Sequence, residues 1–225
     1  MIPLRDRNPS GVFPTVTLSL IVANVAVFLY EVHLGPGVLT FFKHHALIPA
    51  DVVSSVRYHA INLSDTVEPF FTSMFLHGGW LHLILNMWFL WIFGDNVEDT
   101  LGAFRYLLFY FLCGLGAALA QFAVQPQSTV PMLGASGAIA GVLGAYLVLF
   151  PGARVLTLVP VFFFLQVLEI PAVVILGYWF LLQILSGAIE SSGPMRGGVA
   201  YMAHIGGFLV GAVLILLMRP RKVTV

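Results

Sequence analysis

Apolar residues run in long stretches along this chain, and polar residues gather in the segments between them. Six stretches approach the roughly 20 mostly apolar residues that one helical membrane crossing needs. They cover approximately residues 15–34, 76–93, 102–123, 135–151, 170–190 and 199–218. The pattern therefore predicts an all-α polytopic membrane protein, a bundle of six transmembrane helices in a single domain.

One further apolar stretch, residues 155–169, is less suited to a crossing. It is short, it contains Pro160, and Pro171 follows it closely. Proline removes a helical hydrogen bond and interrupts a helix. We expect an interfacial or loop segment that leads into the fifth span, with a seventh crossing as the alternative.

The composition agrees with a membrane protein and narrows its partners. Of the 225 residues, 59% are hydrophobic and 9% are charged, whereas about a quarter of the residues in an ordinary soluble domain are charged. Ten basic and ten acidic residues cancel, and no basic run interleaved with aromatic residues is present. We therefore expect the lipid bilayer, and no nucleic acid, as a partner.

The basic residues between the stretches predict the orientation of the bundle. With six spans both termini share one side of the membrane, and that side holds seven lysines and arginines against three on the other. The seven are Arg5, Arg7, Arg105, Arg154, Arg219, Arg221 and Lys222, and the three are Lys43, Arg57 and Arg196. Because cytoplasmic loops carry the excess of Lys and Arg, we expect cytoplasmic segments at about 1–14 and 219–225 around a six-span core at about 15–218. The long segment 35–75 is then external, and the expected location is a prokaryotic cell (inner) membrane.

A few polar residues fall inside the predicted spans, where they are costly and mark function or contacts between helices. They are His82, Asn86, Ser136, Gln183 and His204. By the predicted topology, all of them except Gln183 lie in the outer halves of their helices and therefore at similar depth. His82 and Asn86 are four residues apart and share one helix face. Considered alone, a serine in a span is explained by a hydrogen bond to its own helix. The histidines and amides, considered alone, are explained by contacts between helices.

Small residues flank two of these polar positions at helical spacing. They are Gly137, Gly141 and Gly144 beside Ser136, and Gly207 and Gly211 beside His204. Strips of glycine let two membrane helices approach closely. We expect the fourth and sixth spans to cross at these strips, close enough for the Ser136 hydroxyl to reach the His204 imidazole.

Hydrolysis of an amide needs a nucleophile, a base that takes its proton, and donors for the developing oxyanion. Ser136 and His204 supply the first two, and Ser136 also lies near a helix N-terminus with its unpaired backbone N–H groups. The Asn86 amide and a ring N–H of His82 add further donors. Because the outer halves of the second, fourth and sixth spans contain no Asp or Glu, we expect a Ser–His dyad, with His204 oriented by packing. A zinc-protease HExxH motif is absent, and we expect no metal and no cofactor.

Four motifs, in this order along the chain, resemble those of rhomboid intramembrane serine proteases. They are His82-x-x-x-Asn86 after FLHGGW, Gly94-x-x-x-Glu98-x-x-x-Gly102, GASG with Ser136, and AHIGG with His204. They cover the second to sixth spans, and the resemblance implies a six-span, rhomboid-like bundle in one rhomboid domain, residues 1–225. It implies that Ser136 is the nucleophile and His204 the general base.

The resemblance also implies roles for the surrounding residues. His82, Asn86 and the backbone N–H of Ser136 would surround the oxyanion, and His77 would assist water or loop contacts in the outer approach. Glu98 would be structural and would tie the inner loop together with Gly94 and Gly102. Some rhomboids have a tyrosine one turn after the serine, which stacks on the catalytic histidine. This chain has Ala140 there, so another group must hold the ring of His204.

The substrates implied by the resemblance are single-span membrane proteins, cut near the outer end of a helix that small or polar residues make easy to unwind. Two alternatives remain. A catalytically inactive rhomboid-like protein would bind membrane clients without cutting them, although such proteins typically lack the serine or the histidine. A transporter would usually contain inverted repeats and broken helices, and neither is evident in the sequence.

Overall fold

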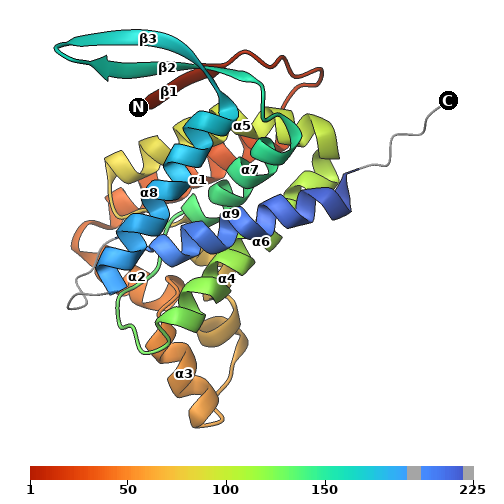
Figure 1. Cartoon of the computed structure of the whole chain (residues 1–225). Coiled ribbons are helices and arrows are strands. Elements are labelled where there is room, and N and C mark those ends of the chain that lie inside the picture. The colour runs from red at the N-terminus through yellow and green to blue at the C-terminus, as the bar shows by residue number, and fades with distance from the viewer. Residues whose placement is uncertain (192–198, 220–225) are drawn as a thin grey trace.

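Helices dominate the computed structural model of the chain, which describes residues 1–191 and 199–219 (Figure 1). Six of its helices occupy the predicted spans: α1 (Thr15–Leu34), α5 (Trp80–Leu101), α6 (Ala103–Val124), α7 (Ser136–Leu149), α8 (Ala172–Ser191) and α9 (Tyr201–Met218). Within the described residues, four are long and apolar enough to cross a membrane: α1 with its continuation to His45, α6, α8 and α9. Helix α5 is long and apolar enough to cross only when it is counted together with the bent helical segment before it, and α7 is shorter. The polytopic helical fold is confirmed, whereas the count of six crossings stays a prediction for α5 and α7.

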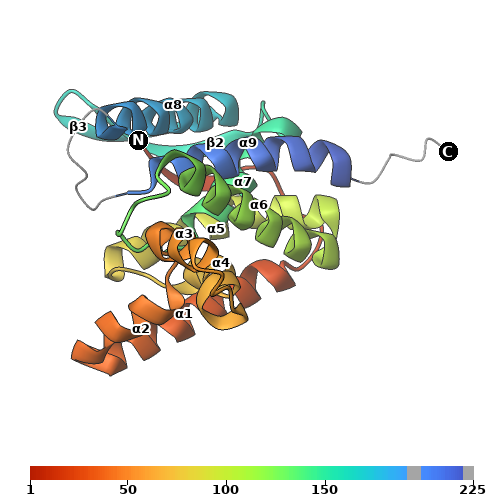
Figure 2. The same ribbon diagram turned by 90° about the horizontal axis from the view of Figure 1, so that it is seen from below.

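Helix α7 lies at the centre of the bundle, among α5, α6, α8 and α9 (Figures 1 and 2). Every residue from Ala138 to Tyr146 is buried. A helix that is apolar on all sides is stable only inside a protein or a membrane, and the neighbouring helices supply this environment. The N-terminal end of α7, which begins at Ser136, is thereby held inside the bundle.

Helices α7 and α9 cross at the glycine strips. A Cβ placed on Gly207 would lie 2.0 Å from the carbonyl oxygen of Gly137, and one on Gly211 would lie 2.0 Å from that of Gly141. A Cβ on Gly144 would lie 2.1 Å from a backbone oxygen of α9. Real Cβ atoms do not approach other atoms this closely, so the two backbones reach this separation only with glycine at these positions.

The segment 155–169 forms an antiparallel β-hairpin that leads into the fifth span. The alternative of a seventh crossing and the expectation of an irregular loop are therefore wrong, and an interfacial position stays a prediction. Strand β2 (Arg154–Val161) pairs with β3 (Phe164–Pro171) and also with β1 (Ile2–Asp6), in the order β1-β2-β3. The valines of both hairpin strands, together with Thr157 and Ile170, suit a pleated surface. The N-terminal segment, expected to be cytoplasmic at about residues 1–14, therefore contributes the third strand of a sheet.

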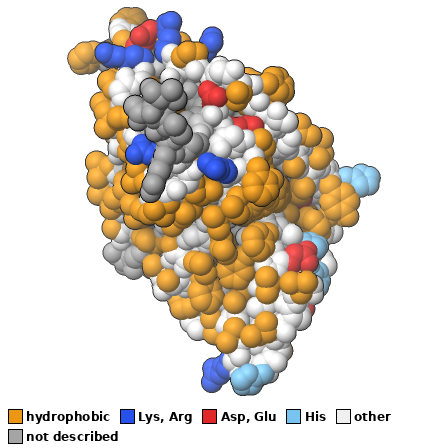
Figure 3. All heavy atoms as spheres, turned by 90° about the vertical axis from the view of Figure 1, so that its right-hand side faces the viewer, with side chains coloured by type: hydrophobic (Ala, Val, Ile, Leu, Met, Phe, Trp, Pro, Cys, Tyr) orange, Lys and Arg blue, Asp and Glu red, His pale blue; other side chains and the backbone are white. Residues whose placement is uncertain are grey.

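This sheet holds the start of α1 and the end of α7 at the same end of the bundle (Figure 1). It brings together Arg5, Arg7 and Arg154, three of the basic residues from which the orientation was predicted. Arg7 forms an exposed ion pair with Glu169 at 2.7 Å. Arg196, Arg221 and Lys222 lie outside the described residues. Figure 3 shows one face of the molecule, on which hydrophobic side chains cover most of the area between the charged groups at its two ends.

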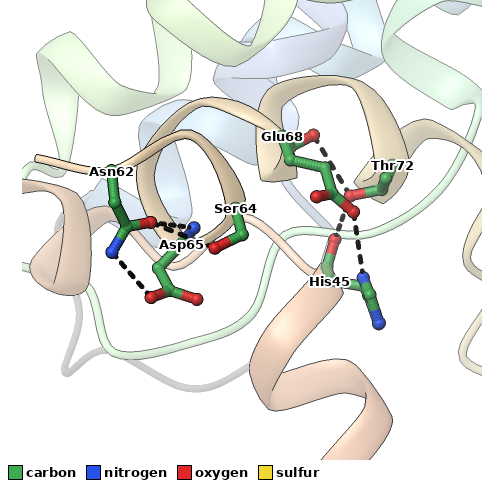
Figure 4. A network of polar contacts seen from close by, with 6 residues as sticks. All are labelled: His45, Asn62, Ser64, Asp65, Glu68 and Thr72. Carbon is green, nitrogen blue, oxygen red and sulfur yellow. Dashed lines mark hydrogen bonds and ion pairs between the residues drawn. The ribbon is translucent and has the colours of Figure 1, made fainter.

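The external segment expected at 35–75 is folded. It contains η1 (Gly35–Gly37), α2 (Val38–His45), α3 (Pro49–Arg57), η2 (Leu63–Val67), α4 (Pro69–Thr72) and η3 (Ser73–Phe75). Asn62 caps η2 by accepting the backbone N–H of Asp65 at 2.6 Å (Figure 4). Thr72 donates its hydroxyl to the carbonyl oxygen of His45 at 2.7 Å, and the His45 ring lies 3.4 Å from the Glu68 carboxylate. These contacts connect α2 to α4 and give the segment a defined shape.

Glu98 joins α5 to the first turn of α1. Its carboxylate accepts the backbone N–H groups of Val16 and Thr17, each at 2.8 Å, and the Thr17 hydroxyl at 2.8 Å. A carboxylate at a helix N-terminus satisfies unpaired N–H groups and complements the helix dipole. Gly94 lies against Thr17 with no room for a Cβ, and Gly102 makes the turn into α6 at φ +75°. The contacts of Glu98 therefore fasten two helices together, rather than only the inner loop that the resemblance implied.

Candidate active site

Ser136 and His204 face each other across the crossing of α7 and α9. The Ser136 hydroxyl lies 2.8 Å from Nε2 of His204. Ser136 is the first residue of α7, and the turn before it passes through Gly134 at φ +121°, a conformation that favours glycine. The Gly134 N–H donates to the carbonyl oxygen of Ser73 at 2.9 Å, which ties this turn to the start of η3. The close helix crossing therefore brings the two residues within hydrogen-bond distance.

Gln183 of α8 occupies the other side of the His204 ring. Its Oε1 lies 2.7 Å from Nδ1 of His204, and its amide nitrogen donates to the Trp179 carbonyl at 3.4 Å. An amide oxygen only accepts hydrogen bonds, so Nδ1 carries the proton and Nε2 is left to accept from the Ser136 hydroxyl. Gln183 thus favours the tautomer in which Nε2 of His204 is free to accept the Ser136 proton.

Sequence reasoning recorded Gln183 as a polar residue inside the fifth span but gave it no part in the site. The search for an orienting group considered only carboxylates, and only on the second, fourth and sixth spans. An amide one helix away supplies the same acceptor without a charge, which is less costly within a bilayer. Its presence in an otherwise apolar helix was the available signal.

Aromatic rings complete the surroundings of His204. The ring centre of Trp179 lies 5.9 Å from that of His204 at an interplanar angle of 34°, and Tyr201 makes an edge contact at 6.4 Å. Trp179 lies one helical turn before Gln183 on α8. The group that holds the ring in place of an aromatic residue at Ala140 therefore comes from α8, and the orientation of His204 depends on packing together with a hydrogen bond.

His82 and Asn86 of α5 face the turn that precedes Ser136. A Cβ on Gly134 would lie 2.7 Å from the His82 ring and 3.7 Å from the Asn86 amide nitrogen. That nitrogen is buried and has no hydrogen-bond partner among the described residues. A buried donor without a partner costs about 1–3 kcal/mol, and such donors are typical of sites that bind a ligand. Asn86 therefore presents a free donor next to the Ser136 turn.

These residues line one cavity of about 850 Å³. Ser136, His204, His82, Asn86 and Trp179 contribute to its walls, and most of the other lining side chains are apolar. This volume lies within the range of about 300–1,000 Å³ that is usual for ligand pockets. No group of three or more His, Cys, Asp or Glu side chains within the described residues is arranged to hold a metal ion.

His77 lies behind His82 and away from the cavity. It is buried, its ring centre lies 5.1 Å from that of His82, and its backbone N–H points to the carboxylate of Glu31 at 3.2 Å. His77 is therefore buried and is not among the residues that line the cavity, and its expected role in water or loop contacts stays a prediction. Glu31 is itself buried in α1, and the survey of polar residues within the spans overlooked it. Its ionisable side chain inside an apolar stretch was visible in the sequence.

Comparisons with known proteins identify the family of the chain. A family model for the rhomboid domain matches residues 64–221. Rhomboid-like protein 11, chloroplastic, of Arabidopsis thaliana is 35% identical over 157 residues, which are 66% of this chain and 51% of that protein. Rhomboid protein 1, mitochondrial, of Saccharomyces cerevisiae is 31% identical over 203 residues, 87% of this chain and 51% of that protein. Rhomboid protease GluP of Bacillus subtilis is 35% identical over 147 residues, 64% of this chain and 25% of that protein.

The chain spans about half the length, or less, of these curated relatives. The names of the plant and yeast relatives place them in the chloroplast and the mitochondrion, so they lend no support to the predicted prokaryotic membrane. The family match covers α5 to α9, the helices that carry the site residues, and extends beyond half of the chain. This chain is an integral, multi-pass membrane protein that belongs to the rhomboid family.

Proposed function

We propose that this chain is an intramembrane serine endopeptidase that cleaves single-span membrane proteins near the outer end of their transmembrane helices. The observation that carries the proposal is the 2.8 Å contact between the Ser136 hydroxyl and Nε2 of His204, inside a cavity among apolar helices. A serine paired with a base whose other nitrogen is fixed by a third group is the arrangement of an activated nucleophile. One of the relatives, GluP, is named a rhomboid protease.

In the first half of the reaction, Ser136 Oγ attacks the carbonyl carbon of the scissile peptide, and Nε2 of His204 takes the hydroxyl proton. The tetrahedral intermediate then collapses, the C–N bond breaks, and His204 returns the proton to the leaving amine. In the second half, His204 removes a proton from water, whose oxygen attacks the acyl-enzyme ester. The ester C–O bond breaks, a carboxylic acid leaves, and Ser136 regains its proton.

The oxyanion of each tetrahedral intermediate is stabilised by donors around the Ser136 turn. The unpartnered amide nitrogen of Asn86 supports this role, as do the unpaired backbone N–H groups at the N-terminus of α7. A ring N–H of His82 adds a donor from the same helix as Asn86. Each such donor contributes about 2.7–4 kcal/mol of transition-state stabilisation in other enzymes.

Gln183 acts as a positioning residue for His204. Its amide oxygen keeps the proton on Nδ1 and holds the ring plane toward Ser136. When the imidazole becomes protonated during the reaction, Nδ1 donates to Gln183 from a charged ring, and this hydrogen bond becomes stronger. Since Gln183 and Trp179 both lie on α8, the position of this helix determines whether the base is aligned.

The proposed orientation has both termini on the cytoplasmic side and the 35–75 segment outside. It rests on the excess of Lys and Arg on the side of the termini. The β1–β2 pairing supports it, since it joins the N-terminal segment to the loop between α7 and α8 at the same end of the bundle. Ser136, at the opposite end of α7 from this loop, is then near the external side.

Cleavage of a fluorescent single-span reporter in liposomes tests the proposal directly. The wild-type chain should cut the reporter and react with a serine-directed phosphonate, and Ser136→Ala should do neither. Ser19→Ala is a matched control, because Ser19 is exposed on α1 and bonds only to its own helix. A Ser136→Ala protein that cuts at the wild-type rate would overturn the proposal, and a folded wild type that binds the reporter without cutting would favour an inactive client-binding protein.

A further inference from the structure

The β2–β3 hairpin ends in an apolar tip, residues 162–165, that extends away from the helices (Figure 1). Phe162 and Phe163 are 94% and 98% exposed, and Phe164 and Leu165 are 73% and 69% exposed. Phe162 and Phe163 are more exposed than any other large hydrophobic residue that the structure describes. Four consecutive apolar side chains that are mostly exposed indicate a surface that another partner covers.

The turn at the tip holds a bulky side chain in a strained backbone conformation. Val161 pairs with Phe164, so Phe162 and Phe163 form a two-residue turn, and Phe162 has φ +52°. Turns of this length normally contain glycine or asparagine where φ is positive, because a bulky side chain is strained there. Glycine or asparagine would stabilise the hairpin better than phenylalanine does at this position. The two aromatic side chains therefore serve a contact outside the hairpin.

Charge is separated from apolar surface along the hairpin. Residues 155–168 contain no charged side chain, whereas Arg154 and Glu169 lie at the base, where Arg7 pairs with Glu169. A change from charged base to aromatic tip matches the change from water to lipid across a membrane interface, which favours aromatic side chains.

The base of the hairpin is fixed at the beginning of a membrane helix. Strand β3 ends at Pro171, and α8 begins at the next residue. The N–H of Ala172 donates to the carbonyl oxygen of Ala153 at 2.8 Å, and that of Val173 donates to Pro151 at 3.0 Å. The hairpin is therefore continuous with the apolar surface of α8, and its base lies at the end of that span.

We propose that the tip of this hairpin inserts into the interfacial region of the bilayer, in the leaflet where α8 begins. The occupant of the exposed patch is thus a lipid surface. Strand β3 is at the edge of the sheet, and the unpaired backbone groups of such an edge are not satisfied in hydrocarbon. Insertion is therefore limited to the tip and to the boundary between headgroups and acyl chains, as in interfacial anchors.

The depth of the tip can be measured with a fluorescent label in liposomes. Phe163→Cys carries the label at the tip, and Arg5→Cys carries it on the exposed face of β1. Because Cys113 is buried, the unsubstituted chain treated with the same dye supplies the background. The tip label should be quenched by spin labels near the lipid headgroups and protected from aqueous iodide, whereas the Arg5→Cys label should show the reverse. Equal quenching of both labels by iodide would overturn the proposal.

A second pair of variants separates insertion from misfolding and from self-association. Leu165→Cys is labelled alone and together with Phe162→Gly and Phe163→Asn, which place glycine at the position of positive φ and maintain the hairpin. The combined substitutions should raise quenching of this label by iodide at least twofold. If the label is protected only at high protein density in the membrane, the tip contacts a second copy of the chain, and the lipid proposal is wrong.

Discussion

Oε1 of Gln183 lies 2.7 Å from Nδ1 of His204. The hydrogen bond joins α8 to α9, while the opposite ring nitrogen of His204 contacts Ser136 at the start of α7. Three helices that are separate in the sequence thus each supply one member of a hydrogen-bonded chain. In the proposed mechanism, both contacts align its middle member, His204, as the base.

Removing the acceptor of Gln183 should slow catalysis more than it weakens substrate binding. We expect Gln183→Leu to lower kcat at least about tenfold with little change in KM, since a tenfold loss corresponds to only about 1.4 kcal/mol of barrier. Gln183→Glu should restore part of the rate because it returns an acceptor to Nδ1. Initial rates on the reporter measure both constants. Gln127→Leu, at an exposed loop position, is the control, and a wild-type kcat in Gln183→Leu would remove Gln183 from the mechanism.

Substitution of either partner in the 2.8 Å contact should abolish cleavage. Ser136→Ala removes the nucleophile and His204→Ala removes the base, and neither introduces a larger side chain into the packed crossing. Both proteins should therefore remain folded by thermal melting in detergent. Turnover above background in either folded variant would contradict a Ser–His dyad.

The free amide of Asn86 should matter for the rate and less for the reactivity of the nucleophile. We expect Asn86→Ala to reduce kcat about 10²–10³-fold, the usual effect of losing one oxyanion donor. The Ser136–His204 pair stays intact, so some phosphonate labelling of Ser136 should persist. Turnover and labelling are compared on the same preparation, and wild-type turnover would show that Asn86 does not stabilise the oxyanion.

The crossing of α7 and α9 should tolerate no side chain at its glycines. A Cβ on Gly207 would lie 2.0 Å from the Gly137 carbonyl oxygen, so Gly207→Val should separate Ser136 from His204 and slow cleavage at least about tenfold. Gly211→Val, one turn deeper, should lower the Tm more than the rate.

Gly177→Val in α8 is the matched control for these two variants, since nothing lies within 4 Å of a Cβ at that position. Rates per labelled active site and Tm are measured in one detergent. A wild-type rate in Gly207→Val would show that close approach at this point is not required for catalysis.

Asp6 should make the stability of the sheet depend on pH. Burial raises its pKa from 3.8 to about 6, although the hydroxyl of Tyr146 donates to its carboxylate at 2.8 Å and opposes the shift. Because the folded state binds the proton more tightly, the contribution of Asp6 to stability is full below pH 3.8 and is lost as the pH rises through about 6. Asp6→Asn should remove this part of the pH dependence and raise the Tm at pH 7. An unchanged pH profile of the Tm would contradict the prediction.

The positions of the helices and of Ser136, His204, His82 and Asn86 along them could be predicted from sequence because the relevant physics is local. In a bilayer each spanning segment must satisfy its own backbone hydrogen bonds, so a long apolar stretch becomes a helix whatever its neighbours are. Polar residues within such stretches are rare, and their positions on the helix follow from spacing alone.

The β-hairpin and the orienting group depended on contacts that no local pattern encodes. Residues 155–169 form a strand pair beside β1, whose partners lie about 150 positions away in the sequence, with Ile2 opposite Leu158. Gln183 reaches His204 only because α8 packs beside α9 with that face inward. Apolar length and residue spacing are local properties, so the sequence was enough to predict the helical spans and their polar residues, and the glycine strips predicted the contact between Ser136 and His204. The partner of His204 Nδ1 could not be predicted in this way, because a hydrogen bond of 2.7 Å to Gln183 depends on the packing of whole helices against one another.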